Sequence, residues 1–147
     1  MTCGHRDVHL EIHSTIEALE LVQAVTEHIA RKVGFDEDTL HWTTMAVRET
    51  VINAMSHGNG NDPAKLVFIN YSATPDDAPA VFVVSVRDQG PGFDPDTVRD
   101  PLTPENILSA NGRGIFLVRQ FMDDVSIRRA PQGGMEVRMS KQIRQRK

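Results

Sequence analysis

The order of helix-like and strand-like segments is the feature of this chain that most restricts its fold. Residues 8–13 alternate apolar and polar side chains, as a half-buried strand does. Two helical segments then follow each other directly, over residues 15–33 and from residue 36 to about residue 57. Apolar side chains of the first recur at the spacing of one helix face, and these are Ile16, Leu19, Val22, Val25 and Ile29.

The second half of the chain is dominated by pairs of strand-like segments. Strands are expected at residues 65–71 and 80–87 and as a final hairpin at 125–129 and 135–140, with a short helix at 114–122, while residues 90–111 lack clear periodicity. This segregated, hairpin-rich order is typical of helices packed on one face of a sheet. We therefore predict an α+β fold, a two-layer sandwich of a mixed, mostly antiparallel sheet with the helices on one face.

The composition indicates an ordinary globular domain. The chain has 147 residues, of which 39% are hydrophobic and 24% charged, and its formal net charge is −4. This charge provides no general attraction to nucleic acid or to a membrane surface. No apolar run approaches the roughly 20 residues of a membrane-spanning helix. Because the N-terminus lacks an apolar signal segment and Cys3 is the single cysteine, we expect one cytoplasmic domain over residues 1–147, with a core at about 8–141 and a basic tail at 142–147.

The first motif that indicates a site is RETVINAMSHGN, residues 48–59, at the end of the second helix. Helical spacing places Val47 and Val51 on one side and Glu49 and Asn53 on roughly the opposite side. The amide oxygen of Asn53 can ligate Mg²⁺, and the Glu49 carboxylate beside it can orient or deprotonate a nucleophile. A solvated helix face explains the same pattern without any site.

The second motif, RDQGPGFDP, follows directly on the strand VFVVSV. An aspartate at a strand end, Asp88, precedes Gly90 and Gly92, which let a ligand approach the backbone closely. The ionised carboxylate can accept a hydrogen bond from an exocyclic amine. The structural alternative is a turn of aspartate, proline and glycine with no ligand.

The third motif, NGRGIFLVRQF, places Gly112, Arg113 and Gly114 in front of a short apolar helix. Unpaired N–H groups at a helix N-terminus favour an anion, and glycines let the anion come close. Arg113 adds a positive charge between the two glycines. A glycine-rich hinge before a core helix is the alternative.

Taken together, the three motifs are more specific than any one of them. In this order, the chain resembles the GHKL-type ATPases with the Bergerat ATP-binding fold. Within them it is similar to the anti-sigma factor serine/threonine-protein kinases of bacterial partner-switching systems. RETVINAMSHGN resembles the N box of this family, RDQGPGFDP its G1 box, and NGRGIFLVRQFMDDV its G2 box with the following strand. The resemblance covers about residues 8–141.

The resemblance implies a role for each matched position. Asn53 matches the asparagine that coordinates Mg²⁺, Glu49 the proposed general base, and Asp88 the aspartate that hydrogen-bonds the adenine amino group of ATP. The other matched positions shape the nucleotide pocket or approach the phosphates, and these are Gly90, Gly92, Gly112, Arg113 and Gly114. The sequence departs from the family at Met135, where a threonine near the adenine-binding aspartate is usual.

The function implied by the resemblance is an ATP- and Mg²⁺-dependent serine/threonine-protein kinase that acts as an anti-sigma factor. Such a protein phosphorylates an anti-sigma-factor antagonist and sequesters a sigma factor, with no direct contact to nucleic acid or membrane. The alternative is a non-catalytic module, nucleotide-gated or nucleotide-free, that only sequesters a protein. Glu49 and Asn53 favour the kinase, whereas Met135 favours the module. A homodimer is possible, with the helix at 15–33 and the N-terminal edge strand as candidate surfaces.

Overall fold

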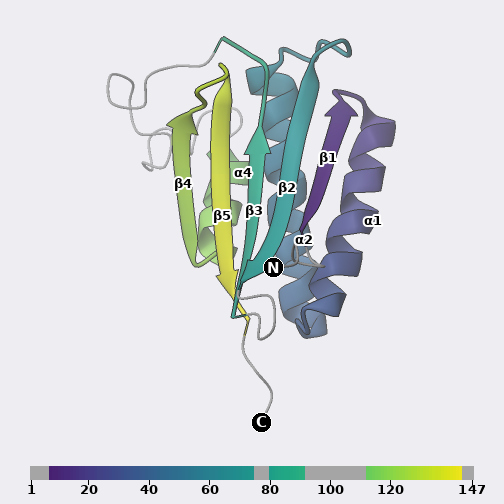
Figure 1. Cartoon of the computed structure of the whole chain (residues 1–147), viewed down its shortest axis with the longest axis vertical. Coiled ribbons are helices and arrows are strands. Elements are labelled where there is room, and N and C mark those ends of the chain that lie inside the picture. The colour runs from purple at the N-terminus through teal and green to yellow at the C-terminus, as the bar shows by residue number, and fades with distance from the viewer. Residues whose placement is uncertain (1–6, 75–79, 92–111, 144–147) are drawn as a thin grey trace, which may run out of the picture.

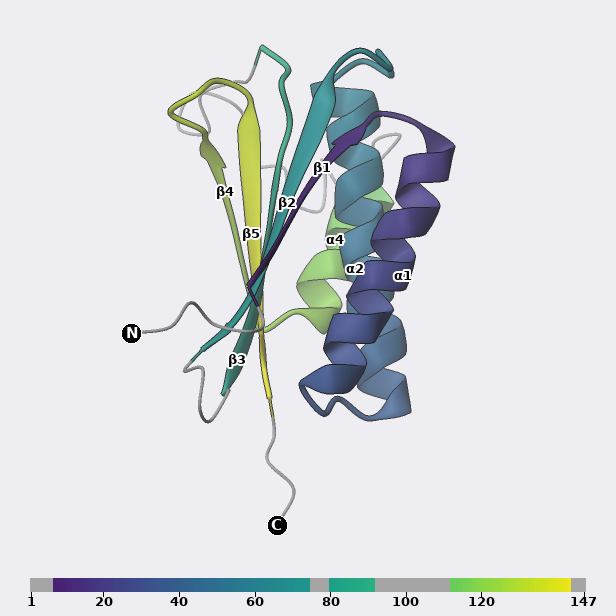
Figure 2. The same cartoon turned by 45° about the vertical axis from the view of Figure 1, so that its right-hand side comes forward.

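The described part of the chain folds into one antiparallel sheet that is covered on one face by helices. The computed structural model describes residues 7–74, 80–91 and 112–143, with the backbone alone at residues 112–116. The strand order is β1-β2-β3-β5-β4 (Figure 1), and α1, α2 and α4 lie on the same side of the sheet (Figure 2). The elements are β1 (Val8–His13), α1 (Ile16–Lys32), α2 (Glu37–Asn53), the π-helical turn η1 (Ala54–Gly58), β2 (Leu66–Thr74), β3 (Val81–Arg87), α4 (Gly112–Phe121), β4 (Asp124–Arg129) and β5 (Met135–Gln142).

Alternation along the strands decides which face the helices cover. Every second residue of β2 is buried, with at most 1% of its surface exposed, and these residues are Val67, Ile69, Tyr71 and Ala73. In β1 the same alternation buries Ile12 and exposes His9, Glu11 and His13. The strand predicted at residues 8–13 is confirmed, and its histidines lie on the open face of the sheet. Burial of the alternate apolar residues against the helices supplies the main hydrophobic stabilisation of the sheet.

Local capping sets the boundaries of the first two helices. The hydroxyl of Thr15 accepts a hydrogen bond from the Ala18 N–H at 3.3 Å, and the Asp36 carboxylate accepts one from the Thr39 N–H at 2.7 Å. Gly34, with φ of +95°, lies in the turn between the helices. On α1 the predicted apolar stripe is buried at Leu19, Val22 and Ile29, whereas Ile16 in the first turn is 75% exposed.

The second predicted helix differs from the structure at its end. The helix predicted to end at about His57 does continue to Gly58, but the α-helical pattern ends at Asn53 and the last turn is the π-helical η1. There the Asn59 N–H donates to the Ala54 carbonyl at 2.9 Å, five residues back instead of four. The wider turn shifts the register by one residue, which places Gly58 and Asn59 against the end of β3.

Some other segments extend beyond one of their predicted ends. β2 continues to Thr74 instead of ending at Tyr71, and α4 begins at Gly112 instead of Gly114. The predicted tail at 142–147 is shorter, because Gln142 belongs to β5 and the Ile143 N–H donates to the Ala80 carbonyl at 2.8 Å. Pairing with β3 accounts for the two longer strands, because both Thr74 and Gln142 lie opposite Val81.

The sheet is antiparallel at all four pairings of the described strands, so the mixed sheet of the prediction is not seen there. The final hairpin places β5, not β4, beside β3, and this order puts Met135 next to the residue that follows β3. Within the described ranges, no helix combines the length and apolar character needed to cross a membrane.

Candidate functional site

Asp88 lies directly after β3 and is 5% exposed. Its Oδ1 accepts hydrogen bonds from the N–H groups of Gly90 at 2.9 Å and Met135 at 3.2 Å. The Asp88 N–H in turn donates to the Met135 carbonyl at 3.1 Å. These bonds hold the carboxylate between the turn after β3 and the start of β5. A buried acceptor fixed by two backbone donors is suited to recognise a hydrogen-bond donor of a ligand.

Three glycines near Asp88 are packed so closely, against Asp88 or against one another, that a side chain fits at none of them. A Cβ at Gly58 would lie 2.1 Å from the Asp88 Oδ2, and one at Gly90 would lie 1.9 Å from the Gly58 carbonyl oxygen. A Cβ at Gly134, where φ is +79°, would lie 2.1 Å from the Asp88 carbonyl oxygen. We call Gly58, Gly90 and Gly134 the glycine cradle. It joins the end of η1, the turn after β3 and the turn before β5.

Met135 holds Asp88 through its backbone. The N–H and the carbonyl of Met135 both bond Asp88, and its side chain is 7% exposed. The replacement of the usual threonine therefore leaves the backbone part of the Asp88 contact in place. The change is confined to the side chain, which is apolar here.

Glu49 and Asn53 lie on α2, one helical turn apart. Both are half-buried, whereas Val47 and Val51 on the other side of the helix are completely buried. The predicted division of this helix into an apolar face and a polar face is confirmed. The Glu49 carboxylate forms an ion pair with the Arg48 guanidinium at 3.8 Å, and about a third of each side chain is exposed. An ion pair this exposed to water contributes little to stability.

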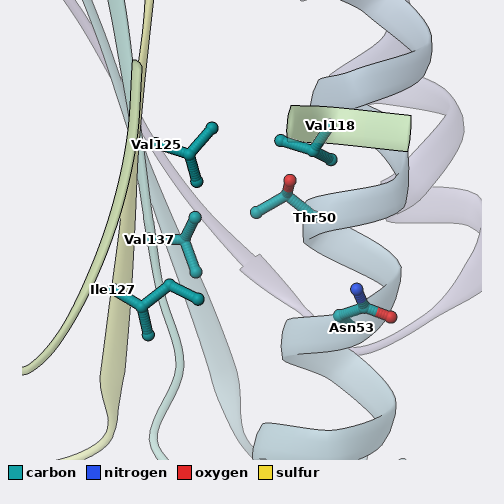
Figure 3. Close-up of a pocket in the computed structure, with 6 residues that line it drawn as sticks. All are labelled: Thr50, Asn53, Val118, Val125, Ile127 and Val137. Carbon is teal, nitrogen blue, oxygen red and sulfur yellow. The ribbon is translucent and has the colours of Figure 1, made fainter. Parts of the chain in front are cut away.

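A hollow next to Asn53 lies between the helices and the C-terminal hairpin (Figure 3). It contains about 300 Å³ of empty space, part of it open to solvent. Thr50 and Asn53 border it from α2, facing side chains from β4 and β5, and the complete lining is Thr50, Asn53, Val118, Val125, Ile127 and Val137. Asp88 is not among these described lining residues. The hollow therefore lies between polar side chains of α2 and an apolar surface. It is separate from the glycine cradle.

The glycines of the third motif form the first turn of α4, as Gly112, Arg113 and Gly114 are its first three residues. The sequence predicts these residues in front of the helix, whereas they lie inside its first turn, where N–H groups have no acceptor within the helix itself. Gly92 lies outside the described residues, as does the side chain of Arg113.

Two residues of the site carry a role that sequence patterns do not reveal. From the sequence, Gly58 and Asn59 are expected only to end a helix. In the structure Gly58 packs on the Asp88 carboxylate, and Asn59 is 2% exposed, with its Oδ1 accepting a hydrogen bond from the Gln89 N–H at 2.8 Å. The available signal was the His-Gly-Asn run directly after the polar helix face, but its partners lie thirty residues away in the sequence.

The profile of the histidine kinase-like ATPase domain family matches residues 12–141. The chain belongs to this family. Among curated relatives, the anti-sigma F factor of Bacillus subtilis (strain 168) is 30% identical over 139 residues, which cover 93% of this chain and 92% of that protein. The serine-protein kinase RsbW of Staphylococcus aureus is 26% identical over 144 residues, which cover 93% and 87%. The resemblance to anti-sigma factor kinases is thereby confirmed.

Solved structures agree on the fold. A crystal structure of the RsbU and RsbW domains of a Mycobacterium tuberculosis protein superposes with a TM-score of 0.65 at 18% identity. The matched region covers 95% of this chain and 33% of the Mycobacterium tuberculosis chain. The mycobacterial sensor histidine kinase MprB gives a TM-score of 0.57 at 16% identity, covering 95% and 100%. Membership in an ATPase domain family implies that the chain uses ATP.

Proposed function

We propose that this protein is an ATP-dependent serine/threonine-protein kinase that works as an anti-sigma factor in the cytoplasm. In this function it phosphorylates a hydroxyl of an anti-sigma-factor antagonist and sequesters a sigma factor. The functions named for two relatives, anti-sigma F factor and serine-protein kinase RsbW, support both halves of the proposal. They favour the kinase over the non-catalytic sequestering module.

The fixed carboxylate of Asp88 in the glycine cradle is the observation that carries the nucleotide part. Its Oδ1 is occupied by the N–H groups of Gly90 and Met135, which orients Oδ2 without neutralising it. An acceptor oriented in this way fits the amino group of adenine, and rejects a base that presents a carbonyl there. The cradle fits a nucleotide because its glycines bring backbone next to the carboxylate.

The polar face of α2 and the start of α4 fit the phosphate end of the nucleotide. Mg-ATP, when bound, supplies the transferable phosphoryl group and a divalent charge. Asn53 offers a neutral oxygen of the kind that Mg²⁺ accepts, and Gly112 and Gly114 offer backbone N–H groups at a helix N-terminus. Arg113 would add a positive charge beside the phosphates. Glu49, one turn before Asn53, would orient the partner hydroxyl and receive its proton.

Calorimetric titration of Mg-ATP into the wild type and into Asp88→Asn tests the adenine site. Asparagine keeps an oxygen for the N–H groups of Gly90 and Met135 but places an amide nitrogen at the position of Oδ2. We expect ATP affinity to fall at least about tenfold, the value of one charge-assisted hydrogen bond, with GTP affinity nearly unchanged. Equal losses for ATP and GTP, or no binding to the folded wild type, would refute the assignment.

Phosphate transfer to a purified antagonist protein tests the role of Glu49. We expect Glu49→Ala to bind Mg-ATP as the wild type does and to lose transfer by about 10²- to 10⁴-fold, the usual contribution of a general base. Glu37→Ala, at the exposed start of the same helix, is the matched control and keeps full transfer. Transfer at the wild-type rate in Glu49→Ala would exclude the general base.

A further inference from the structure

The Asn59 side chain is a buried amide that uses both its donor and its acceptor atoms. Its Oδ1 accepts from the Gln89 N–H at 2.8 Å. Its Nδ2 donates to the Leu66 carbonyl at 2.9 Å and to the Ser14 hydroxyl oxygen at 3.0 Å. These three partners belong to three segments: the turn after β3, the start of β2, and the turn between β1 and α1. A fully paired amide of this kind holds its neighbours in one arrangement.

Gln89 closes this network from the other side. Its Oε1 accepts from the Leu66 N–H at 2.7 Å, so Leu66 is bonded through its N–H to Gln89 and through its carbonyl to Asn59. The Ser14 hydroxyl accepts the hydrogen bond from the Asn59 Nδ2 and itself donates one to the Lys65 carbonyl at 2.9 Å. The turn after β3 is therefore tied to the first residues of β2 by two side chains.

The network adjoins Asp88 on both sides. Asn59 follows Gly58, whose Cα faces the Asp88 carboxylate, and Gln89 lies between Asp88 and Gly90. The bond between Asn59 and the Gln89 N–H thus joins the two chain segments that enclose Asp88. Within the described residues, the carboxylate itself is bonded by the N–H groups of Gly90 and Met135, and the bond of Asn59 fixes the residue that lies between Asp88 and Gly90.

We propose that Asn59 is a positioning residue for Asp88, which fixes the distance between η1 and the turn after β3 and thereby sets the adenine preference of the site. The inference rests on the proposed ATP site for its effect on nucleotide choice. It rests on geometry alone for its effect on the Asp88 carboxylate. Asn59 itself touches neither nucleotide nor metal in this role.

The test compares Asn59→Ala with Ser14→Ala. The first variant removes the tie to Gln89. The second keeps that tie and removes the Ser14 hydroxyl, with its bonds to the Asn59 Nδ2 and to the Lys65 carbonyl. We expect the ratio of ATP to GTP affinity to fall at least about tenfold in Asn59→Ala and to stay within about twofold of the wild type in Ser14→Ala. Asn59→Asp keeps the acceptor for the Gln89 N–H and should retain more of the ATP preference than Asn59→Ala, although the carboxylate faces the Leu66 carbonyl and lowers stability.

Hydrogen exchange at the Gly90 amide gives a readout that needs no nucleotide. The Gly90 N–H donates to Asp88, so its protection reports whether the carboxylate is held. We expect this protection to fall relative to the global stability in Asn59→Ala and to persist in Ser14→Ala. Equal protection and equal nucleotide ratios in the two variants would overturn the proposal. A wild type that binds no ATP would refute the proposed function instead, while the exchange result would still decide the role of Asn59.

Discussion

Thr43 stands out at the scale of single residues. Among the described residues, it holds the buried side-chain oxygen that lacks a hydrogen-bond partner, and it is 1% exposed. Thr43→Val keeps the shape of the side chain and removes the unpaired hydroxyl. We expect it to raise the free energy of unfolding by about 1 kcal/mol, because the desolvation cost of that group disappears. Urea denaturation should show a higher midpoint with an unchanged slope.

Thr26→Val is the matched control, since Thr26 is equally buried but fully paired. Its hydroxyl donates to the Val22 carbonyl at 2.7 Å and shares a hydrogen bond of 2.7 Å with the Tyr71 hydroxyl. The substitution leaves the Tyr71 hydroxyl unpaired, so we expect a loss of about 1–3 kcal/mol. If both variants lost stability, Thr43 would have a partner in solution.

At the scale of elements, the π-helical turn η1 decides how the end of α2 meets β3. Its wider register places Gly58 where a Cβ would lie 2.1 Å from the Asp88 Oδ2. Because Asp88 is held by two N–H groups, the carboxylate cannot move aside freely. We expect Gly58→Ala to lower stability by about 1–3 kcal/mol through overpacking and to weaken ATP binding measured by calorimetry.

Gly60→Ala provides the control for Gly58→Ala within the same loop. A Cβ at Gly60 meets no atom within 4 Å, but φ is +62°, so the substitution strains the backbone alone. We expect a stability loss of about 1 kcal/mol with unchanged ATP affinity. Weakened binding in both variants would mean that general destabilisation, not the contact with Asp88, causes the effect.

At the scale of the whole molecule, Tyr71 links the sheet to α1 at the centre of the core. Burial raises its pKa to about 12, partly offset by the hydrogen bond with Thr26. The unfolded chain loses this proton near pH 10, so the folded state binds it more tightly between these two values. The contribution of this proton to the free energy of unfolding is therefore fully present below about pH 10 and is lost as the pH rises through about 12. The loss amounts to at most about 3 kcal/mol.

The alkaline transition can be measured directly, because Tyr71 is the single tyrosine of the chain. Tyrosinate absorbance should titrate near pH 12 in the folded protein and near pH 10 in denaturant. Tyr71→Phe, compared at the same pH values, should lack this part of the alkaline loss while other groups titrate as before. Titration near pH 10 in the folded protein would show that the ring is accessible to water.

Much of the arrangement is determined by the sequence itself. Side chains four residues apart on a helix share a face, so the division of α2 between Val47 and Val51 on one side and Glu49 and Asn53 on the other follows from spacing. The position of Asp88 at the end of a strand follows from the apolar run before it. The family could be inferred because its three motifs depend on local order along the chain.

Tertiary structure alone decided how these local pieces meet. The contact of Gly58 with Asp88 and the three bonds of Asn59 all join residues from different segments, and the π-helical turn η1 leads directly into both. Periodicity carries information over one or two turns, whereas the partners of Asn59 are 7, 30 and 45 residues away in the sequence. Which buried groups find each other depends on the strand order β3-β5-β4 and on helix packing, and these emerge only when the whole core has formed.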